Sequence, residues 1–414
     1  MSELHIGSLY WPSTLHNPPS YPSLTGCETA QVVVIGGGMS GITCAWELIS
    51  SGIDVILVER EIVAGESTSA NTGLLQYCND VMLSDLIGQI GRESAETFYV
   101  ACSRAIDKLA DIAASLPEDV GFRRRSSLYY ASTEQDLPKL RQEYEALSSC
   151  GLRASYWTAD DIAAHFPFRK PGAIVTGGDA EVNPFRFVTL LAAQAVDKGL
   201  RIREYTEIVK HDSLADGRHR LHTGNGHHID ANHVIYAIGY EPKELRGELI
   251  KPDIGRSFVI VTDPVPDLSQ WHERCMIWET ARPYLYMRTT EDNRLIIGGL
   301  DEEDRNPLQS VQRRKEHSEK LLEKAKALFP DLPLAIAYDW NATFGESEDN
   351  LPFVGEDPEW PGVYYTLGYG GNGTVYSLLG AELVRELIQG EADSNPLKDI
   401  IGLSRATLRE GTPR

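Results

Sequence analysis

The sequence lacks the features that define several protein classes. No apolar stretch reaches the roughly 18 residues that a membrane span needs, and the N-terminus has no basic region followed by an apolar run. Neither a membrane helix nor a signal peptide is therefore expected. None of the six cysteines stands in CxxC spacing, which excludes a zinc ribbon and a thioredoxin-type motif. Scattered thiols in a chain of this length indicate reduced cysteines and a cytoplasmic location.

Basic residues are also scarce. Lys and Arg number 39 against 60 Asp and Glu, which gives a formal net charge of 39 − 60 = −21. This balance disfavours contacts with nucleic-acid phosphates and docking on an anionic membrane surface. Small neutral or cationic partners remain compatible with it. The chain has 414 residues, 42% of them hydrophobic and 24% charged, which is the composition of a globular protein of two to three domains.

Histidines give no metal motif. The eleven are scattered, and their one local cluster (His219, His222, His227 and His228) falls in residues 206–232, where turn signals predict a small antiparallel meander. A metal site needs ligands that converge on one point. No metal is predicted.

A βαβ pattern lies near the start of the chain. Residues 31–35 are a short β-branched apolar run that ends at glycines, and residues 54–59 are a second such run. Between them, residues 40–51 have the apolar spacing of a helix, and Gly52 is a suitable stop. Residues 1–30, rich in Pro, Ser and Tyr, are expected to form an arm without regular structure.

The turn between the first strand and the helix carries GxGxxG spacing, in Gly36-Gly37-Gly38-Met39-Ser40-Gly41. Gly36 permits a tight turn, Gly38 lets the backbone approach a pyrophosphate, and Gly41 lets helix and strand pack closely. Glu59 ends the second strand 18 residues after Gly41, where a carboxylate accepts from ribose hydroxyls. Strand, helix and acid together favour a dinucleotide site over a glycine-rich packing turn.

Three further segments favour FAD over a nicotinamide dinucleotide. Residues 65–73 form a loop rich in hydroxyls and amides right after the second strand, and a solvated loop is the alternative reading. The apolar strand over residues 233–238 ends in small residues, where adenosine can press on the backbone. A glycine cluster at residues 368–373 precedes a buried helix predicted from residue 374 to 389. Such a helix start supplies amides and positive dipole to a reduced flavin ring.

With these residues the sequence resembles the FAD-dependent amine and amino-acid oxidases of the D-amino-acid oxidase superfamily. It is most similar to the branch of glycine oxidase, sarcosine oxidase and γ-glutamylputrescine oxidase. The resemblance covers nearly the whole chain and rests on residues 22–26, 36–59, 67–73, 182–184, 237–239, 286–288, 294–299, 349–355 and 368–373. These motifs are specific for the superfamily and not for one substrate.

The resemblance implies an FAD cofactor and the residues that hold it. Some relatives attach the flavin through a Cys within the segment that corresponds to residues 340–348, which contains none here, so FAD is expected to be non-covalent. The implied cofactor-binding residues are Gly36, Gly38, Met39, Ser40, Gly41, Glu59, Arg60, Ser67, Thr68, Asn71, Thr72, Gly73, Leu74, Ile208, Val209, Ala237, Gly239, Gly345, Gly371, Gly373 and Thr374.

The same resemblance implies a substrate site formed by Arg288, Asn372 and Tyr286. Arg288 corresponds to the arginine that grips the substrate carboxylate in amino-acid-oxidising relatives, and its fork geometry suits bidentate binding. A structural salt bridge is the alternative for this residue. Asn372 stands where several relatives have His, and Val375 stands where sarcosine oxidases keep a substrate-binding Lys.

The expected fold is α/β. A Rossmann-like FAD-binding domain is predicted from residues 1–80, 183–245 and 340–414, with an interleaved α+β substrate domain, built on an antiparallel sheet, from residues 81–182 and 246–339. The expected function is oxidation of the C–N bond of a small amine or amino acid by hydride transfer to flavin N5, followed by hydrolysis of the imine. Oxygen or another acceptor then takes the electrons. The oligomeric state is not indicated.

Three alternatives remain open from the sequence. One is a dehydrogenase that passes electrons to a quinone or a carrier protein. Another is a flavin-bearing subunit without activity of its own. The third is an RNA-modifying module, which the charge of −21 disfavours.

Overall fold

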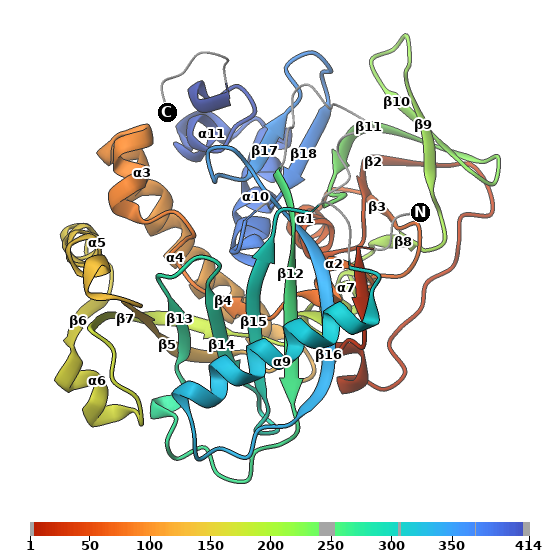
Figure 1. Cartoon of the computed structure of the whole chain (residues 1–414). Coiled ribbons are helices and arrows are strands. Elements are labelled where there is room, and N and C mark those ends of the chain that lie inside the picture. Colours follow the sequence, from red (N-terminus) through yellow and green to blue (C-terminus); the bar gives the residue numbers. More distant parts are fainter. Residues whose placement is uncertain (1–3, 240–252, 305–307, 369, 409–414) are drawn as a thin grey trace.

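Two β-sheets organise the chain in the computed structural model, which describes residues 4–239, 253–304, 308–368 and 370–408 (Figure 1). The first sheet has the order β17 (Phe353–Glu356), β18 (Val363–Leu367), β11 (His228–Tyr236), β2 (Glu28–Ile35), β3 (Val55–Val58) and β8 (Arg201–Arg203), with β10 (His219–Thr223) paired to β11 and β9 (Ile208–Ser213) paired to β10. Strands β18, β11, β2, β3 and β8 run parallel to one another, whereas β17 and β10 pair antiparallel with β18 and β11. This sheet is the Rossmann-like part of the expected α/β fold.

The first strands and helix of this sheet confirm the βαβ prediction. Helix α1 (Met39–Ser50) joins β2 to β3, whose four residues are all buried. Val32 and Val34 belong to the core that includes α1, whereas Val33 and Ile35 belong to the core on the opposite face. Continuous apolar runs are required because helices and strands cover both faces of the sheet.

The predicted meander over residues 206–232 is confirmed as β9, β10 and the start of β11. The strand predicted over residues 233–238 is confirmed as the second half of β11, which begins five residues earlier and runs without a break from His228 to Tyr236. Its first residues pair antiparallel with β10, and its whole length pairs parallel with β2. The turn signals in the sequence mark the β10–β11 hairpin, but nothing between residues 228 and 236 interrupts the strand.

The second sheet is mostly antiparallel. Its order is β1 (His5–Gly7), β16 (Ile336–Glu346), β12 (Asp253–Thr262), β15 (Leu295–Glu302), β14 (Leu285–Thr289), β13 (Met276–Glu279), β5 (Arg123–Tyr130), β7 (Gly172–Glu181) and β4 (Leu74–Leu75), with β6 (Ala154–Thr158) paired to β7. The expectation of an arm without structure is wrong: β1 pairs with β16, and Trp11 is only 3% exposed. Burial of an apolar side chain to this extent is favourable, so Trp11 holds the N-terminal arm against the rest of the chain.

Helices cover the sheets. Helices α7 (Pro184–Asp197) and α10 (Gly373–Gln389) pack against α1, and α4 (Arg92–Ser115) packs against α10. Helix α9 (Val311–Leu328) lies across β12, β15 and β16 (Figure 1). The other helices are α2 (Ser67–Ala70), α3 (Leu83–Ile90), α5 (Leu137–Ser149), α6 (Ala159–His165) and α11 (Leu397–Ile400), with short 3₁₀ turns η1 (Trp11–Thr14), η2 (Glu134–Asp136), η3 (His272–Arg274), η4 (Ala392–Ser394) and η5 (Ala406–Leu408).

The two sheets do not follow every domain boundary predicted from the sequence. Strands β1 and β16 lie in the second sheet, although residues 1–80 and 340–414 were assigned to the FAD-binding domain. The predicted boundary at residues 245 and 246 lies outside the described residues. The domain division stays a prediction.

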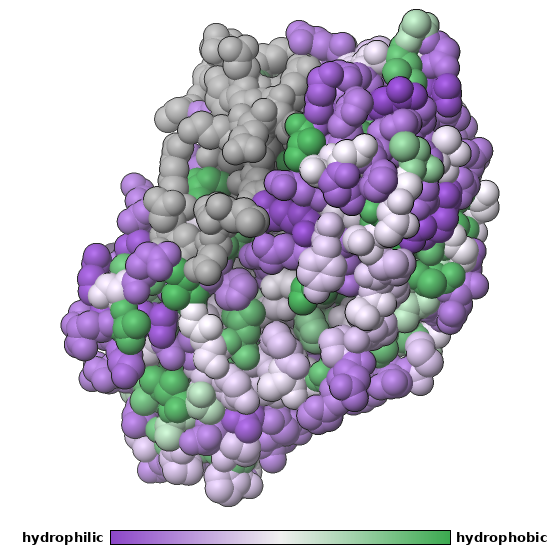
Figure 2. Space-filling model, turned by 90° about the vertical axis from the view of Figure 1, so that its right-hand side faces the viewer, coloured by the Kyte–Doolittle hydropathy of each residue, from purple (hydrophilic) through white to green (hydrophobic). Residues whose placement is uncertain are grey.

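The described residues include no helix that is long and apolar enough to cross a membrane. Figure 2 shows one face of the molecule, and on its coloured part the apolar residues are scattered among hydrophilic ones.

Candidate functional site

A groove of about 430 Å³ opens where β2, β3 and β11 end and α1 begins. It brings together most of the predicted cofactor residues. Those in its lining are Gly36, Gly38, Met39, Ser40, Glu59, Arg60, Ser67, Thr68, Asn71, Ile208, Val209, Ala237, Gly239, Gly373 and Thr374. Their position outside the carboxyl ends of parallel strands is where open α/β sheets bind ligands.

A second cavity of about 150 Å³, called the chamber below, adjoins the groove. Ser67 and Asn71 line both cavities, so the two adjoin at this loop. Predicted residues in the chamber lining alone are Thr72, Leu74, Tyr286, Gly371 and Asn372. Four predicted residues line neither cavity: Gly41, Gly73, Gly345 and Arg288.

The start of α1 faces the groove. Gly36 has φ of +110°, and a Cβ added to Gly41 would lie 1.8 Å from the Gly36 carbonyl oxygen, so this turn requires glycine at both positions. The Met39 N–H donates to Thr68 Oγ1 at 3.0 Å. Other N–H groups of the first helical turn have no partner within the helix, and with the positive dipole they favour an anion.

The starts of α1 and α10 are tied together. Ser40 Oγ lies 2.7 Å from Ser377 Oγ, which joins the second residue of α1 to the fifth residue of α10. The backbone N–H of Gly370 donates to the carbonyl of Gly345 at 2.8 Å, so Gly345 holds the glycine cluster in place from outside both cavities. Residue 369 of that cluster lies outside the described residues. The N-termini of α1 and α10 therefore both border the groove.

Glu59 is fixed at the edge of the groove. The Gly37 N–H donates to its Oε2 at 2.7 Å, and the Glu61 N–H donates to its Oε1 at 2.9 Å. Burial raises the pKa of the Glu59 carboxyl, and these two hydrogen bonds work against that rise. Each carboxylate oxygen keeps a further lone pair, which can accept from a hydroxyl of a ligand.

The mouth of the groove carries exposed apolar side chains. Val209 is 58% exposed and Ile62 is 44% exposed, and both line the groove. His211 lines it too, with Nδ1 2.8 Å from the Tyr236 hydroxyl. Burial lowers the pKa of His211 to about 3, so this ring is neutral at physiological pH. The exposed apolar side chains and the neutral His211 ring suit an aromatic base.

The loop between groove and chamber is held from two sides. Trp11 Nε1 in the N-terminal arm donates to the Asn71 carbonyl at 2.6 Å, and Trp340 Nε1 in β16 donates to the Ala70 carbonyl at 3.1 Å. The Gly73 N–H donates to Asn71 Oδ1 at 2.6 Å, and Gly73 has φ of +73°. Gly73 therefore shapes the loop from behind the lining.

Aromatic residues form much of the chamber. Trp278 stacks on Tyr129 with 3.7 Å between ring centroids, and Tyr284, Tyr286 and Phe344 also line the chamber. Trp278 is 6% exposed, and its Nε1 has no hydrogen-bond partner within the described ranges. Because a buried N–H without an acceptor is costly, this group fits a ligand that accepts a hydrogen bond.

Asn372 lies in the chamber wall but is engaged by neighbours. Its side-chain amide donates to the Cys78 carbonyl at 2.8 Å and to Asn79 Oδ1, which also accepts from the Tyr376 hydroxyl at 2.8 Å. Asn372 is 6% exposed. The amide is thereby fixed in one orientation at the start of α10.

Two acids in the chamber were missed by the sequence analysis. Asp80 accepts from the Gly371 N–H at 2.7 Å and from the Tyr284 hydroxyl at 3.3 Å. Asp301 Oδ1 is buried and has no hydrogen-bond partner in the part of the chain that the structure describes. Burial, and then the neighbouring Asp80, raise the pKa of Asp301 to about 6. The one available signal was that Asp301 directly follows the apolar run of residues 295–300.

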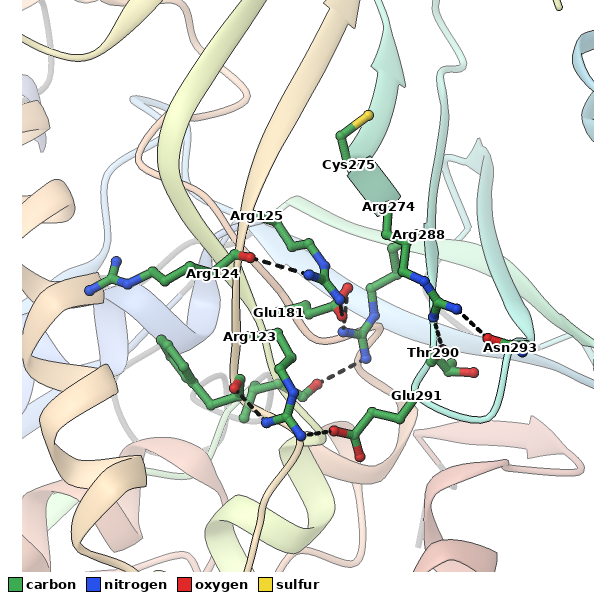
Figure 3. A network of polar contacts seen from close by, with 12 residues as sticks. Arg123, Arg124, Arg125, Glu181, Arg274, Cys275, Arg288, Thr290, Glu291 and Asn293 are labelled. Atoms are coloured by element: carbon green, nitrogen blue, oxygen red, sulfur yellow. Dashed lines mark hydrogen bonds and ion pairs between the residues drawn. The ribbon is translucent and has the colours of Figure 1, made fainter. Parts of the chain in front are cut away.

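Arg288 lies behind the chamber wall, in the network of Figure 3. Its guanidinium is 3.4 Å from Glu181 Oε2 and donates to the Val182 carbonyl at 2.9 Å. Trp11 covers it, with the ring centroid 5.1 Å from the guanidinium carbon. Arg125 binds the other oxygen of Glu181 at 2.9 Å. Burial lowers the pKa of Arg288, and Glu181 opposes that effect. This arrangement matches the salt-bridge alternative, and the carboxylate clamp stays a prediction.

Comparisons with known proteins agree on one family. A family model described as FAD dependent oxidoreductase matches residues 31–387. A protein of Bacillus subtilis whose name describes a Rieske 2Fe-2S iron-sulfur protein is 26% identical over 97% of this chain and 76% of its own length. The glycine oxidase of Geobacillus kaustophilus is 26% identical over 86% of this chain and 92% of that enzyme.

Solved structures have the same fold. The crystal structure of glycine oxidase from Geobacillus kaustophilus superposes with a TM-score of 0.73 at 22% identity, and covers 89% of this chain and 96% of that one. An L-amino acid deaminase from Proteus vulgaris reaches 0.76 at 18% identity, covering 94% and 97%. The two-sheet arrangement of this chain is thus the fold of these two enzymes.

Proposed function

The chain belongs to the family of FAD-dependent oxidoreductases, and from this premise we propose that it oxidises the C–N bond of a small amine or amino acid. The observation that carries the proposal is the chamber, which adjoins the groove and is lined by aromatic and acidic side chains. FAD is the cofactor of the family. Glycine oxidase and γ-glutamylputrescine oxidoreductase, among the relatives, support an amine as the donor.

The groove residues fit FAD. We propose that Glu59 accepts from the ribose, that the first turn of α1 and Thr68 hold the pyrophosphate, and that Val209 with Ile208 covers the adenine. Gly371, Gly373 and Thr374 at the start of α10 then lie at the ring end. The exposed apolar rim and the unpartnered Trp278 N–H are the features that such a ligand would cover or satisfy.

When bound, FAD supplies the two-electron acceptor that takes hydride from the α-carbon. The residues of the chain position the amine and exclude water, which is how a protein contributes to such chemistry. We propose that Tyr286, Trp278 and Phe344 enclose the amine. Asn372, held by Cys78 and Asn79, fixes the wall of the chamber opposite them.

The proposed attachment of FAD is non-covalent. No cysteine occurs in residues 340–348, and Cys78, which does line the chamber, is fully buried with its pKa raised by burial, so its thiol is un-ionised. Precipitation with trichloroacetic acid is expected to leave the yellow colour in the supernatant. A yellow pellet would contradict non-covalent binding.

Anaerobic reduction tests the function. Purified protein with bound FAD is mixed without oxygen with glycine, sarcosine, proline, D- and L-amino acids and aliphatic amines, and the visible flavin absorbance is followed. Bleaching by at least one amine is expected. No bleaching by any of them, with FAD present and reducible by dithionite, would contradict the proposal.

A second candidate concerns the electron acceptor. The Bacillus subtilis relative matches over 97% of this chain but only 76% of its own length, and its name describes an iron-sulfur protein. This observation favours a dehydrogenase that passes electrons to an iron-sulfur carrier. Hydrogen peroxide released in step with amine consumption in air would contradict it, whereas turnover that needs an added one-electron acceptor would support it.

A further inference from the structure

The charges of the chamber are of one sign. Asp80 and Asp301 line it, and no Lys, Arg or His from the described residues does. Glu346, at the end of β16, is a third acid of this group, since burial and then Asp80 and Asp301 raise its pKa to about 7. A substrate carboxylate in this chamber would face at least two acids and no cation.

The nearest cation does not neutralise the acids. Arg282 donates to the backbone carbonyl of Asp80 at 3.4 Å, and its guanidinium carbon lies 4.6 Å from the ring centroid of Tyr284. Its charge lowers the pKa of Asp301 and Glu346 somewhat, but burial and mutual repulsion outweigh it. The candidate clamp, Arg288, forms an ion pair with Glu181 at 3.4 Å, donates to the Val182 carbonyl, keeps a buried Nε without a hydrogen-bond partner among the described residues, and lies outside the chamber lining.

Asp301 offers an open acceptor. Its Oδ1 is buried, lines the chamber and has no hydrogen-bond partner within the described residues. A buried carboxylate oxygen without a donor is costly, and a bound ammonium removes that cost by a charge-assisted hydrogen bond. The aromatic rings of Trp278, Tyr284, Tyr286 and Phe344 line the same cavity, and ring faces attract cations.

We infer that the chamber selects an aliphatic amine that carries a second, distal ammonium and no carboxylate next to the reacting carbon, with Asp301 and Asp80 binding the distal ammonium. This inference rests on the proposed oxidation of an amine. The two acids are proposed to bind the distal nitrogen because a nearby carboxylate favours the charged form of an amine. The nitrogen that assists hydride loss, by contrast, must be neutral. One nitrogen therefore anchors while the other reacts.

A pair of ligands that cannot be oxidised tests the charge preference. tert-Butylammonium and pivalate share the tert-butyl group and carry opposite charges, and neither has a hydrogen on the carbon next to the charged group. Their dissociation constants for the FAD-loaded protein are measured by calorimetry. We expect the ammonium to bind about tenfold tighter or more, the ratio of one charge-assisted hydrogen bond. Tighter binding of pivalate would overturn the inference.

Variants locate the effect. Asp301→Asn is expected to weaken binding of tert-butylammonium about tenfold, and Asp301→Glu, which keeps the charge, to restore most of it. The control is Glu303→Gln, which removes the same charge from an exposed residue two positions away and is expected to change nothing. Equal binding by Asp301→Asn and Glu303→Gln would overturn the assignment of Asp301.

Matched substrates separate this inference from the proposed function. 1,4-Diaminobutane, butylamine and ornithine differ by one ammonium or one carboxylate, and each is tested for anaerobic reduction of the bound flavin. Reduction fastest with the diamine supports both proposals. Reduction fastest with ornithine or other carboxylated amines keeps the proposed function and overturns this inference. Binding of tert-butylammonium without reduction by any amine overturns the proposed function and keeps the charge preference.

Discussion

The groove and the chamber adjoin each other, but they are built in different ways. The groove is shaped mainly by backbone, with Gly36 and Gly41 in contact at the turn of one βαβ unit. The chamber is shaped by side chains from segments far apart, among them Asp80, Trp278 and Asp301. The carboxylates of the two cavities differ in their hydrogen bonds. Glu59 accepts hydrogen bonds from two backbone N–H groups, whereas Asp301 Oδ1 accepts none from the described residues.

This difference separates what the family shares from what one member selects. A backbone cradle binds phosphate and ring edges in any chain that keeps its glycines. Side chains in a chamber can change without disturbing that cradle, so specificity resides there. Behind the chamber wall, the buried Arg288 is paired with Glu181, whereas Asp301 Oδ1 in the chamber lining has no hydrogen-bond partner among the described residues.

The largest expected effect is on stability, and it tests whether the buried charges behind the chamber wall depend on their partners. Glu181→Gln leaves two buried or half-buried arginines, Arg288 and Arg125, without their carboxylate. The free energy of unfolding is expected to fall by about 3–5 kcal/mol, measured by denaturant titration. The control Glu291→Gln removes the exposed partner of Arg123 and is expected to cost about 0–1 kcal/mol. Equal losses in both variants would show that Glu181 does not compensate the cluster.

The next effect breaks the groove and leaves the chamber residues unchanged. In Gly41→Ala, the added Cβ would lie 1.8 Å from the Gly36 carbonyl oxygen, so α1 must shift away from the turn. Strain of about 1–3 kcal/mol is expected to weaken FAD binding about tenfold, read as flavin absorbance per protein after gel filtration. In Gly26→Ala, the Cβ meets nothing within 4 Å, and FAD content should equal that of the wild type.

A smaller effect follows from the raised pKa of Asp301, about 6 in the folded chain. The pKa of this carboxyl in the unfolded chain is near 4, so the folded state binds the proton more tightly. The contribution of Asp301 to the free energy of unfolding is therefore lost as the pH rises from 4 through 6. Asp301→Asn should therefore raise the melting temperature relative to wild type at pH 8, by about 1–3 °C, and much less at pH 5. Glu303→Gln serves as the control. If Asp301→Asn changes the melting temperature equally at pH 5 and pH 8, this account is contradicted.

The smallest effect concerns the rim of the groove. Val209→Ala removes apolar surface that adenine is proposed to cover, and a loss of two methyl groups is expected to raise the dissociation constant of FAD about two- to fivefold. Val311→Ala, at a similarly exposed valine on α9, removes the same groups away from both cavities and should leave the constant unchanged. An unchanged constant for Val209→Ala would place the adenine elsewhere.

Local patterns account for the parts of the structure that the sequence predicted. The strands before Gly36 and up to Glu59 are continuous apolar runs, and the helix between them has helical apolar spacing, so the turn and its acid follow from about 30 residues of chain. The helix after the glycine cluster is confirmed as α10 for the same reason. By contrast, the strand in the N-terminal arm was not predicted. The reason is that β1 is only three residues long and depends on β16 for its partner.

Register and long-range pairing account for what the sequence did not predict. The chamber exists because β12 pairs with β15 and β16, which brings Ser257, Asp301 and Phe344 to one cavity from positions more than 40 residues apart. A one-residue shift in such a pairing would turn each side chain to the other face. The burial of Arg288 against Glu181 depends likewise on strands β14 and β7, which are not hydrogen-bonded neighbours.

The amino-acid sequence by itself determined the βαβ unit, its glycine turn, the acid that follows and thereby the class of cofactor, because these depend on contacts between near neighbours in the chain. Only the tertiary structure decided which charged groups are paired and which face the cavity, because burial and the approach of distant strands set the electrostatic environment of each carboxylate and guanidinium.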